Sequence, residues 1–129
     1  MNKLDKESVL GISALLVHAA NIDEIYSEHE KNLIKDFIKS YLTNDDENEI
    51  LKKAEEIENN SNQLLNYTNI IKENSLEIKK NIIEHLWKVI ISDNAVDQYE
   101  SNLMRRICGL IYFSDKECAE IKLKLINNK

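Results

Sequence analysis

The chain has 129 residues, 43% of them hydrophobic, so it is long enough to bury a core and too apolar to be disordered. It contains no proline and only two glycines. This shortage of turn formers, beside many Leu, Ile, Lys and Glu residues, predicts an all-α protein. The net charge of −6 argues against nucleic acid as a partner, because phosphate binding needs clustered basic side chains.

The sequence also bears on location and on the state of the cysteines. No apolar run approaches the roughly 20 residues that a membrane span requires. The first ten residues, MNKLDKESVL, carry acids and lack the apolar core of a signal peptide. We therefore expect a cytoplasmic protein with no membrane span. Cys108 and Cys118 are then expected to be reduced thiols, with a disulfide between adjacent helices as the alternative.

Helix start signals divide the first half of the chain into three helical segments. Asp5 or Ser8 can open a helix whose apolar residues recur at helical spacing. The pair Ser27–Glu30 forms a capping box, in which each side chain bonds the backbone N–H of the other, and Asn44–Glu47 repeats the device. The charged run 52–58, KKAEEIE, is typical of the solvent-facing surface of a helix.

The second half predicts four more helices. The polar run ENNSNQ, 58–63, marks a junction before a short helix from Leu64 to Ile71. Ser75 starts a long helix whose wide apolar face, including Trp87, predicts a central place in the core. The pairs Asp97–Glu100 and Ser114–Glu117 open the last two helices. We therefore expect a compact bundle of about seven helices.

The chain resembles itself when it is shifted by seventy residues. Between residues 12 and 47, eight residues are identical to the residue seventy positions later: Ile12 and Ile82, Leu16 and Leu86, Asp23 and Asp93, Glu30 and Glu100, Asn32 and Asn102, Leu33 and Leu103, Asp45 and Asp115, Glu47 and Glu117. The pattern predicts a single domain over 1–129 built from two helix–acidic loop–helix units, at about 8–58 and 75–127, with a helical connector at 59–74. Pseudo-symmetric packing of these units would bring the two acidic loops near each other.

The second half also resembles the TerB-like domain, the tellurite-resistance protein B-like family. The motifs that carry the resemblance are a Leu-Trp pair, a loop Asp followed by a further acid and a Glu, and a Leu-x-Arg-Arg stretch. Here they are Leu86-Trp87, Asp93-Asn94, Asp97, Glu100, and Leu103 with Arg105-Arg106. The segment ALLVHAANIDEIYSEHEKNLIKDFI in the first half is similar to the family's other copy of the same unit, with Asp23 and Glu30 in the matching places.

The resemblance implies an all-helical bundle, a bacterial cytosolic protein tied to tellurite or general stress resistance, and a cluster of acids that bind metal cations. It implies no enzyme activity. The chain departs from the family pattern at two points. The glycine after the loop Asp is replaced by Glu24 in the first copy and by Asn94 in the second, and Ser27 stands where the second copy has Asp97. The first loop thus has one acidic ligand fewer than the second.

Each candidate ligand also has a purely structural explanation. Asp97 and Glu100, like Ser27 and Glu30, would cap a helix and complement its dipole, and we favour capping over metal ligation for these four residues. Asp23 and Asp93 lie four residues before the caps, where local helix chemistry does not require an acid. For this last pair, an Asx-turn and an oxygen-ligand site for a cation are equally open.

Other kinds of site find little support. His18, His29 and His85 form no zinc-binding set and are expected at the surface or at the edge of the core. We find no motif for a catalytic nucleophile or a glycine-rich phosphate loop, so the protein is predicted not to be an enzyme.

The leading hypothesis is therefore a non-enzymatic module that binds a divalent cation. Mg²⁺ or Ca²⁺ is favoured over Zn²⁺, and the predicted ligands are Asp23, Glu30, Asp93, Asp97 and Glu100. The alternative is a protein-interaction or homodimerisation module whose acids are structural and whose apolar surface lies on the helix from Leu64 to Ile71.

Overall fold

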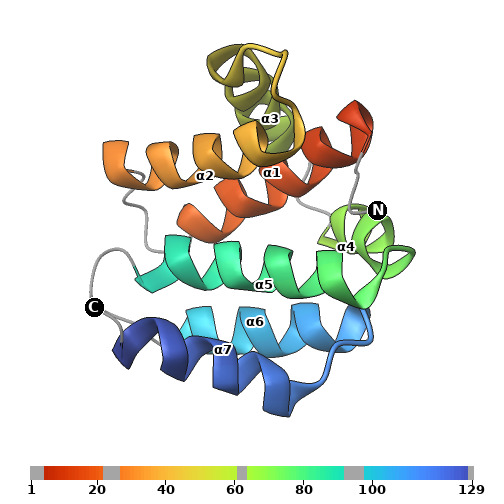
Figure 1. Ribbon diagram of the computed structural model, residues 1–129, viewed down its shortest axis with the longest axis vertical. Helices are drawn as coiled ribbons and strands as arrows, with labels where there is room; N and C mark the ends of the chain where they lie inside the picture. The colour runs from red at the N-terminus through yellow and green to blue at the C-terminus, as the bar shows by residue number, and fades with distance from the viewer. Residues whose placement is uncertain (1–4, 22–26, 61–63, 92–97, 128–129) are drawn as a thin grey trace.

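The computed structural model describes residues 5–21, 27–60, 64–91 and 98–127, and of residues 64–66 and 98–100 it describes the backbone alone. These ranges fold into helices and contain no strand (Figure 1), which confirms the predicted all-α fold of about seven helices. The helices are α1 (Lys6–Ala20), α2 (Glu28–Tyr41), α3 (Glu47–Asn60), α4 (Leu64–Lys72), α5 (Leu76–Ile91), α6 (Gln98–Leu110) and α7 (Asp115–Asn127).

The helix boundaries follow the seventy-residue offset of the sequence. Helices α1 and α5 begin at residues 6 and 76, and α2 and α6 begin at residues 28 and 98. In Figure 1, α1, α2 and α3 occupy the upper part of the molecule, while α5, α6 and α7 occupy the middle and lower parts. Helix α4 connects the two sets and packs against α1, α5 and α6.

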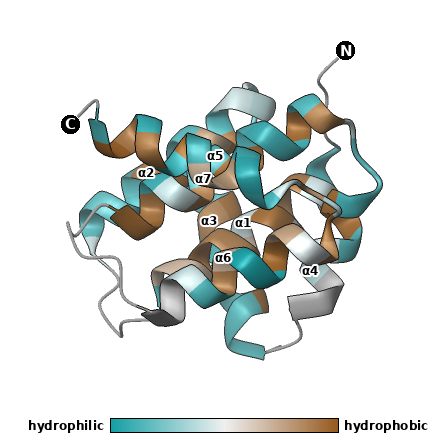
Figure 2. Ribbon diagram, turned by 90° about the horizontal axis from the view of Figure 1, so that it is seen from below, coloured by the Kyte–Doolittle hydropathy of each residue, from teal (hydrophilic) through white to brown (hydrophobic). Residues whose placement is uncertain are grey.

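The core is built mainly from α1 and α5. Nine of the fifteen residues of α1 and eight of the sixteen residues of α5 are buried. The apolar faces of the helices turn inward and the polar faces turn outward (Figure 2). Four of the residues that repeat at the seventy-residue offset, Ile12, Leu16, Ile82 and Leu86, are fully buried. Trp87 is also buried, as expected.

Polar side chains at the helix starts explain where most of the helices begin. The Ser8 backbone N–H donates to Asp5 Oδ1 at 2.7 Å, so Asp5 is the cap of α1. The Ser75 hydroxyl likewise accepts from the Ile78 N–H, and the Ser114 hydroxyl accepts from the Glu117 N–H. These bonds satisfy N–H groups that have no partner inside their own helix.

The predicted start of α3 is wrong by two residues. The capping residue is Asp46, whose Oδ1 accepts from the Asn48 N–H at 3.0 Å, rather than Asn44. Asp46 directly precedes the first helical residue, so its short side chain reaches the second N–H of the helix, which Asn44 is too far away to do. The intervening Asp45 forms an ion pair with Lys6 at the start of α1.

The two glycines occupy different surroundings. Gly11 lies where α4 approaches α1, and a Cβ atom added there would lie 2.5 Å from Ile70 Cδ1. A Cβ atom at Gly109 in α6 would meet no described atom within 4 Å. Gly11 therefore permits helix packing, whereas Gly109 has no such role among the described residues.

Ile70→Val removes the one atom, Cδ1, that an alanine at position 11 would strike. The destabilisation caused by Gly11→Ala should therefore be about 1 kcal/mol smaller in the Ile70→Val background than in the native one. Urea unfolding of the four chains in this double-mutant cycle measures the difference. Gly109→Ala is the control: it should add about 0.5 kcal/mol to the free energy of unfolding in either background. If the effect of Gly109→Ala depended on the Ile70→Val background as strongly as the effect of Gly11→Ala, the packing role assigned to Gly11 would be contradicted.

Candidate functional site

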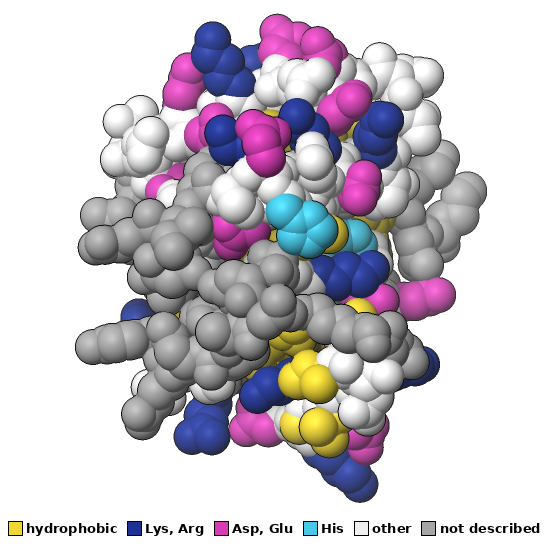
Figure 3. Space-filling model, turned by 90° about the vertical axis from the view of Figure 1, so that its left-hand side faces the viewer, with side chains coloured by type: hydrophobic (Ala, Val, Ile, Leu, Met, Phe, Trp, Pro, Cys, Tyr) yellow, Lys and Arg dark blue, Asp and Glu magenta, His cyan; other side chains and the backbone are white. Residues whose placement is uncertain are grey.

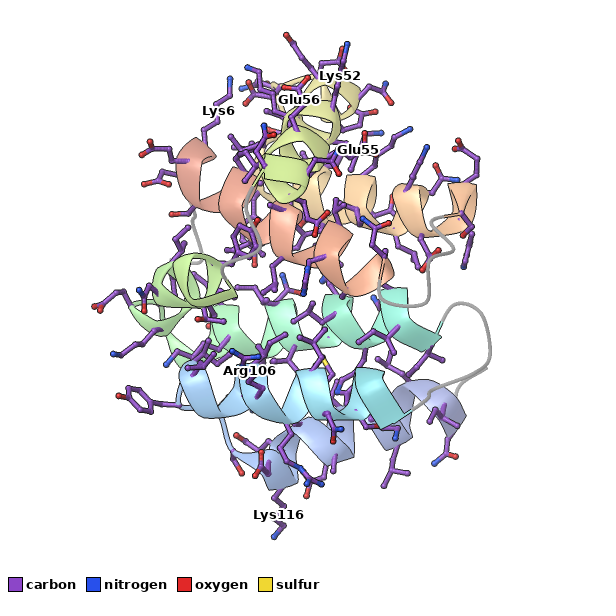
Figure 4. All side chains as sticks on the ribbon, turned by 180° about the vertical axis from the view of Figure 1, so that it is seen from behind. Lys6, Lys52, Glu55, Glu56, Arg106 and Lys116 are labelled. Atoms are coloured by element: carbon purple, nitrogen blue, oxygen red, sulfur yellow. The ribbon has the colours of Figure 1, made fainter. Side chains whose placement is uncertain are left out.

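Four helix ends lie on one side of the bundle. The C-terminal ends of α1 and α5 and the N-terminal ends of α2 and α6 all lie on the left-hand side of Figure 1, and they lie together again in the reversed view of Figure 4. These ends flank the two acidic segments that the sequence predicts to bind a cation. Figure 3 looks onto this end and shows acidic, basic and histidine side chains around it.

Of the five predicted ligands, Glu30 is the one whose side chain the structure describes. Asp23, Asp93 and Asp97 lie outside the described residues. Glu100 lies in the first turn of α6, and its side chain is also outside the described part. The two helices that carry Glu30 and Glu100 nevertheless begin at the same end of the molecule (Figure 1).

Glu30 forms the predicted capping box with Ser27. The Ser27 N–H donates to Glu30 Oε1 at 2.8 Å, and the Glu30 N–H donates to the Ser27 hydroxyl at 3.2 Å. The capping function proposed for this pair is therefore confirmed. Glu30 is only 4% exposed, which is unusual for a glutamate, whereas Glu28 and His29 just before it in α2 are exposed.

A second buried carboxylate lies near the end of α1. Glu58, in the last turn of α3, is 9% exposed. Its Oε1 lies 3.0 Å from His18 Nδ1, and its Oε2 accepts from Asn21 Nδ2 at 3.3 Å. Glu58 is thus shared between two side chains from the end of α1. The three side chains form one polar cluster immediately before the first acidic segment.

The expectation that the whole run 52–58 faces solvent is wrong at Glu58. Lys52 and Glu56 are exposed on the outer side of α3 (Figure 4), but Leu51, Ala54 and Glu58 lie on the face that packs against α1. Their spacing of three and then four residues places them on one helix face. That spacing could have indicated that Glu58 shares a buried face with Leu51 and Ala54. A charged residue is normally expected at the surface, so its burial was not predicted.

The histidines occupy the surface or the edge of the core, as expected. His29 is exposed, and His18 and His85 are partly buried. His85 packs edge-on against Phe37, with ring centroids 5.1 Å apart, and its Nδ1 lies 2.9 Å from the Asn81 carbonyl oxygen. Among the described residues, no three His, Cys, Asp or Glu side chains lie close enough together to hold a metal ion.

Burial controls the protonation of His85. It lowers the pKa of His85 below the ordinary value of 6.5, with a smaller contribution in the same direction from Lys88. The Asn81 carbonyl, Glu84 and Asp36 act in the opposite direction. The folded protein therefore favours the neutral imidazole.

The fold and this end of the molecule define a class: an all-α protein of two similar helical units with acidic segments between their first two helices. Residues 10–123 match the family model described as tellurite resistance protein TerB. The match spans most of the chain, so the protein belongs to the TerB family. Searches of curated proteins and of solved structures found no match. Among the described helices, none has the length and apolar character needed to cross a membrane.

Glu58→Ala should lower the free energy of unfolding by about 2 kcal/mol, because it leaves His18 and Asn21 partly buried without their shared partner. Glu56→Ala, two residues earlier on the exposed side of α3, is the matched control and should change it by less than about 0.5 kcal/mol. Chemical unfolding at neutral pH measures both. Equal effects of the two substitutions would show that the cluster does not stabilise the fold.

Stability should fall as the pH drops below about 6.5, the ordinary pKa of histidine. In that range the unfolded chain binds a proton at His85 more readily than the folded chain, so protonation favours unfolding. His85→Leu should reduce this pH dependence, while His29→Gln at the exposed histidine should leave it unchanged. Unfolding free energies measured across about pH 5–8 test the difference. If His85→Leu and His29→Gln reduced the change of unfolding free energy with pH equally, the role of His85 would be contradicted.

Proposed function

We propose that this TerB-family protein acts without catalysis, by binding a divalent cation at the end of the bundle where its acidic segments lie. The ligands would be carboxylate oxygens of Asp23, Glu30, Asp93, Asp97 and Glu100, with water in the remaining positions. Oxygen ligands of this kind suit Mg²⁺ or Ca²⁺ better than Zn²⁺, which prefers nitrogen and sulfur.

The observation that carries this proposal is the convergence of four helix ends. Asp23 follows α1 and Asp93 follows α5 in the sequence, and these two helices end on the same side of the molecule (Figure 1). Helix α2, which starts at this end with Glu30, packs against both α1 and α5. The two acidic segments, seventy residues apart in the sequence, thus connect helix ends that lie on the same side of the molecule.

The acids themselves are what would attract a cation to this region. The partial negative charge at the C-terminal ends of α1 and α5 is opposed by the partial positive charge at the N-terminal ends of α2 and α6, which lie on the same side of the molecule. Glu30 adds a carboxylate that is almost fully buried. Its Oε1 accepts the capping bond from the Ser27 N–H.

The biological setting is proposed from the family. The family description concerns tellurite resistance. We infer a role in the bacterial cytoplasm in tellurite or general stress resistance, with the bound cation holding the two helical units in one arrangement.

A second candidate function is protein interaction or homodimerisation, and one observation favours it. Leu123 and Ile126 on α7 are 57% and 40% exposed, and Figure 3 shows hydrophobic side chains gathered over the lower part of the molecule, where α6 and α7 lie. The expected apolar surface on α4 is not seen in its described side chains, because Tyr67 and Ile71 are buried in the core. A partner would therefore bind α7 rather than α4.

Titration of the chain with Mg²⁺, Ca²⁺, Mn²⁺ and Zn²⁺ tests the leading proposal. Mg²⁺ or Ca²⁺ should release heat and stabilise the fold by about 2.7 kcal/mol when its concentration is about a hundred times Kd. Calorimetry and thermal unfolding at increasing metal concentration measure the two effects.

Two variants separate ligation from helix capping. Asp93→Ala should abolish the stabilisation by metal, whereas Asp97→Ser keeps a capping side chain and should weaken binding without abolishing it. The absence of heat and of any thermal shift at millimolar metal would exclude cation binding. Equal loss of binding in both variants would make Asp97 as essential as Asp93.

A further inference from the structure

The two cysteines lie together at the interface between α6 and α7. Cys108 is fully buried and Cys118 is 5% exposed. Both are free thiols, and their side chains lie near enough for each to shift the pKa of the other. The two thiols are therefore close together in the reduced protein, although they are ten residues apart in the sequence.

The surroundings of Cys118 differ from those of Cys108. The indole of Trp87 on α5 donates from Nε1 to Cys118 Sγ at 3.3 Å. The Lys122 ammonium lies over the same indole ring, 5.2 Å from its centre. Cys118 also lines a cleft of about 480 Å³ between α6 and α7, together with Trp87, Arg105, Asp115 and Lys122. Cys118 is thus the thiol that a small molecule in this cleft would meet first.

These contacts shift the pKa values of the two thiols in opposite directions. The hydrogen bond from Cys108 lowers the pKa of Cys118 to about 7, with further help from Trp87 and Lys122, although burial and Asp115 oppose it. The same hydrogen bond and burial raise the pKa of Cys108. The outer thiol is therefore the one of the pair that ionises more readily, and the inner one stays protonated. A thiolate is the reactive form of cysteine toward oxidants.

We propose that Cys118 is a site of oxidation by hydrogen peroxide and small organic hydroperoxides, and that Cys108 converts the product into a disulfide linking α6 to α7. The inference rests on the cleft, on the Trp87 hydrogen bond and on the contact between the two thiols. It is independent of cation binding, because neither cysteine is among the predicted cation ligands.

The proposed oxidation takes place in two steps. The Cys118 thiolate attacks one peroxide oxygen, an S–O bond forms, the O–O bond breaks and hydroxide leaves, so that the sulfur is oxidised to a sulfenic acid and the peroxide is reduced. Cys108 sulfur then attacks the sulfenic sulfur, the S–S bond forms and the S–O bond breaks. The proton of the Cys108 thiol joins the departing hydroxide as water.

The experiment exposes the reduced full-length chain to hydrogen peroxide, and then alkylates the remaining thiols for intact mass and peptide mapping. Both thiols should disappear together, with a peptide linking Cys108 to Cys118 and no disulfide-linked dimer on a non-reducing gel. The fluorescence of Trp87, the single tryptophan, should change at the same rate. A dithiol reductant should reverse both changes.

Three variants make the order of events testable. Cys108→Ser should stop at a sulfenic acid on Cys118 that dimedone traps. Cys118→Ser should leave the buried Cys108 at least about tenfold less reactive than Cys118. Trp87→Phe keeps an aromatic ring but removes the N–H donor, and should slow oxidation of Cys118 several-fold. Thermal unfolding shows whether each variant is folded.

Three results would overturn the proposal. The first is equal reactivity of Cys108 and Cys118 in the folded single-cysteine variants. The second is a disulfide between two chains in place of one within the chain. The third is survival of both thiols under peroxide that oxidises the guanidinium-unfolded chain.

Discussion

The structure depends on the burial of α1 against α2, α3, α4 and α5 at once. A helix enclosed on so many sides has little room for bulk, and an unpaired polar group within it is costly. The one such side-chain atom among the described residues is Ser13 Oγ, which is buried without a hydrogen-bond partner. Gly11 lets α4 come close, and His18, near the end of the helix, finds a partner in Glu58. Because α1 is enclosed in this way, its end is fixed relative to α5, and so is the point from which the first acidic segment departs.

The seventy-residue repeat relates this packing to the proposed cation site. In each unit, a buried helix is followed by an acidic segment and then by a helix that starts at the same end of the bundle. The Ser27–Glu30 capping box shows that one of these acids already has a structural role. Capping and cation binding are compatible, because capping fixes the position of a carboxylate to which a cation would then bind. Helix α7, by contrast, lies at the periphery, where its exposed leucine and isoleucine are available to a partner.

Much of this fold could be predicted from the sequence, because helical periodicity and capping side chains are local signals. The starts of α1, α2, α5 and α7 coincide with polar residues that bond the first turn. Two features could not be predicted in this way. The burial of Glu58 depends on α1 lying opposite it, and the contact between Cys108 and Cys118 depends on how α6 packs on α7. Both are tertiary properties: the spacing of Leu51, Ala54 and Glu58 indicates one helix face, but it does not say what that face packs against.

The central claim is that segments seventy residues apart meet at one cation site, and paramagnetic broadening by Mn²⁺ tests it most directly. Nuclear magnetic resonance spectra recorded during a Mn²⁺ titration report which amides lie near the ion. The account predicts that amides at the end of α1 and the start of α2 broaden at the same Mn²⁺ concentration as amides at the end of α5 and the start of α6, and that excess Mg²⁺ or Ca²⁺ reverses the effect. Broadening confined to one of these segments, or spread over the acidic outer surface of α3, would contradict it.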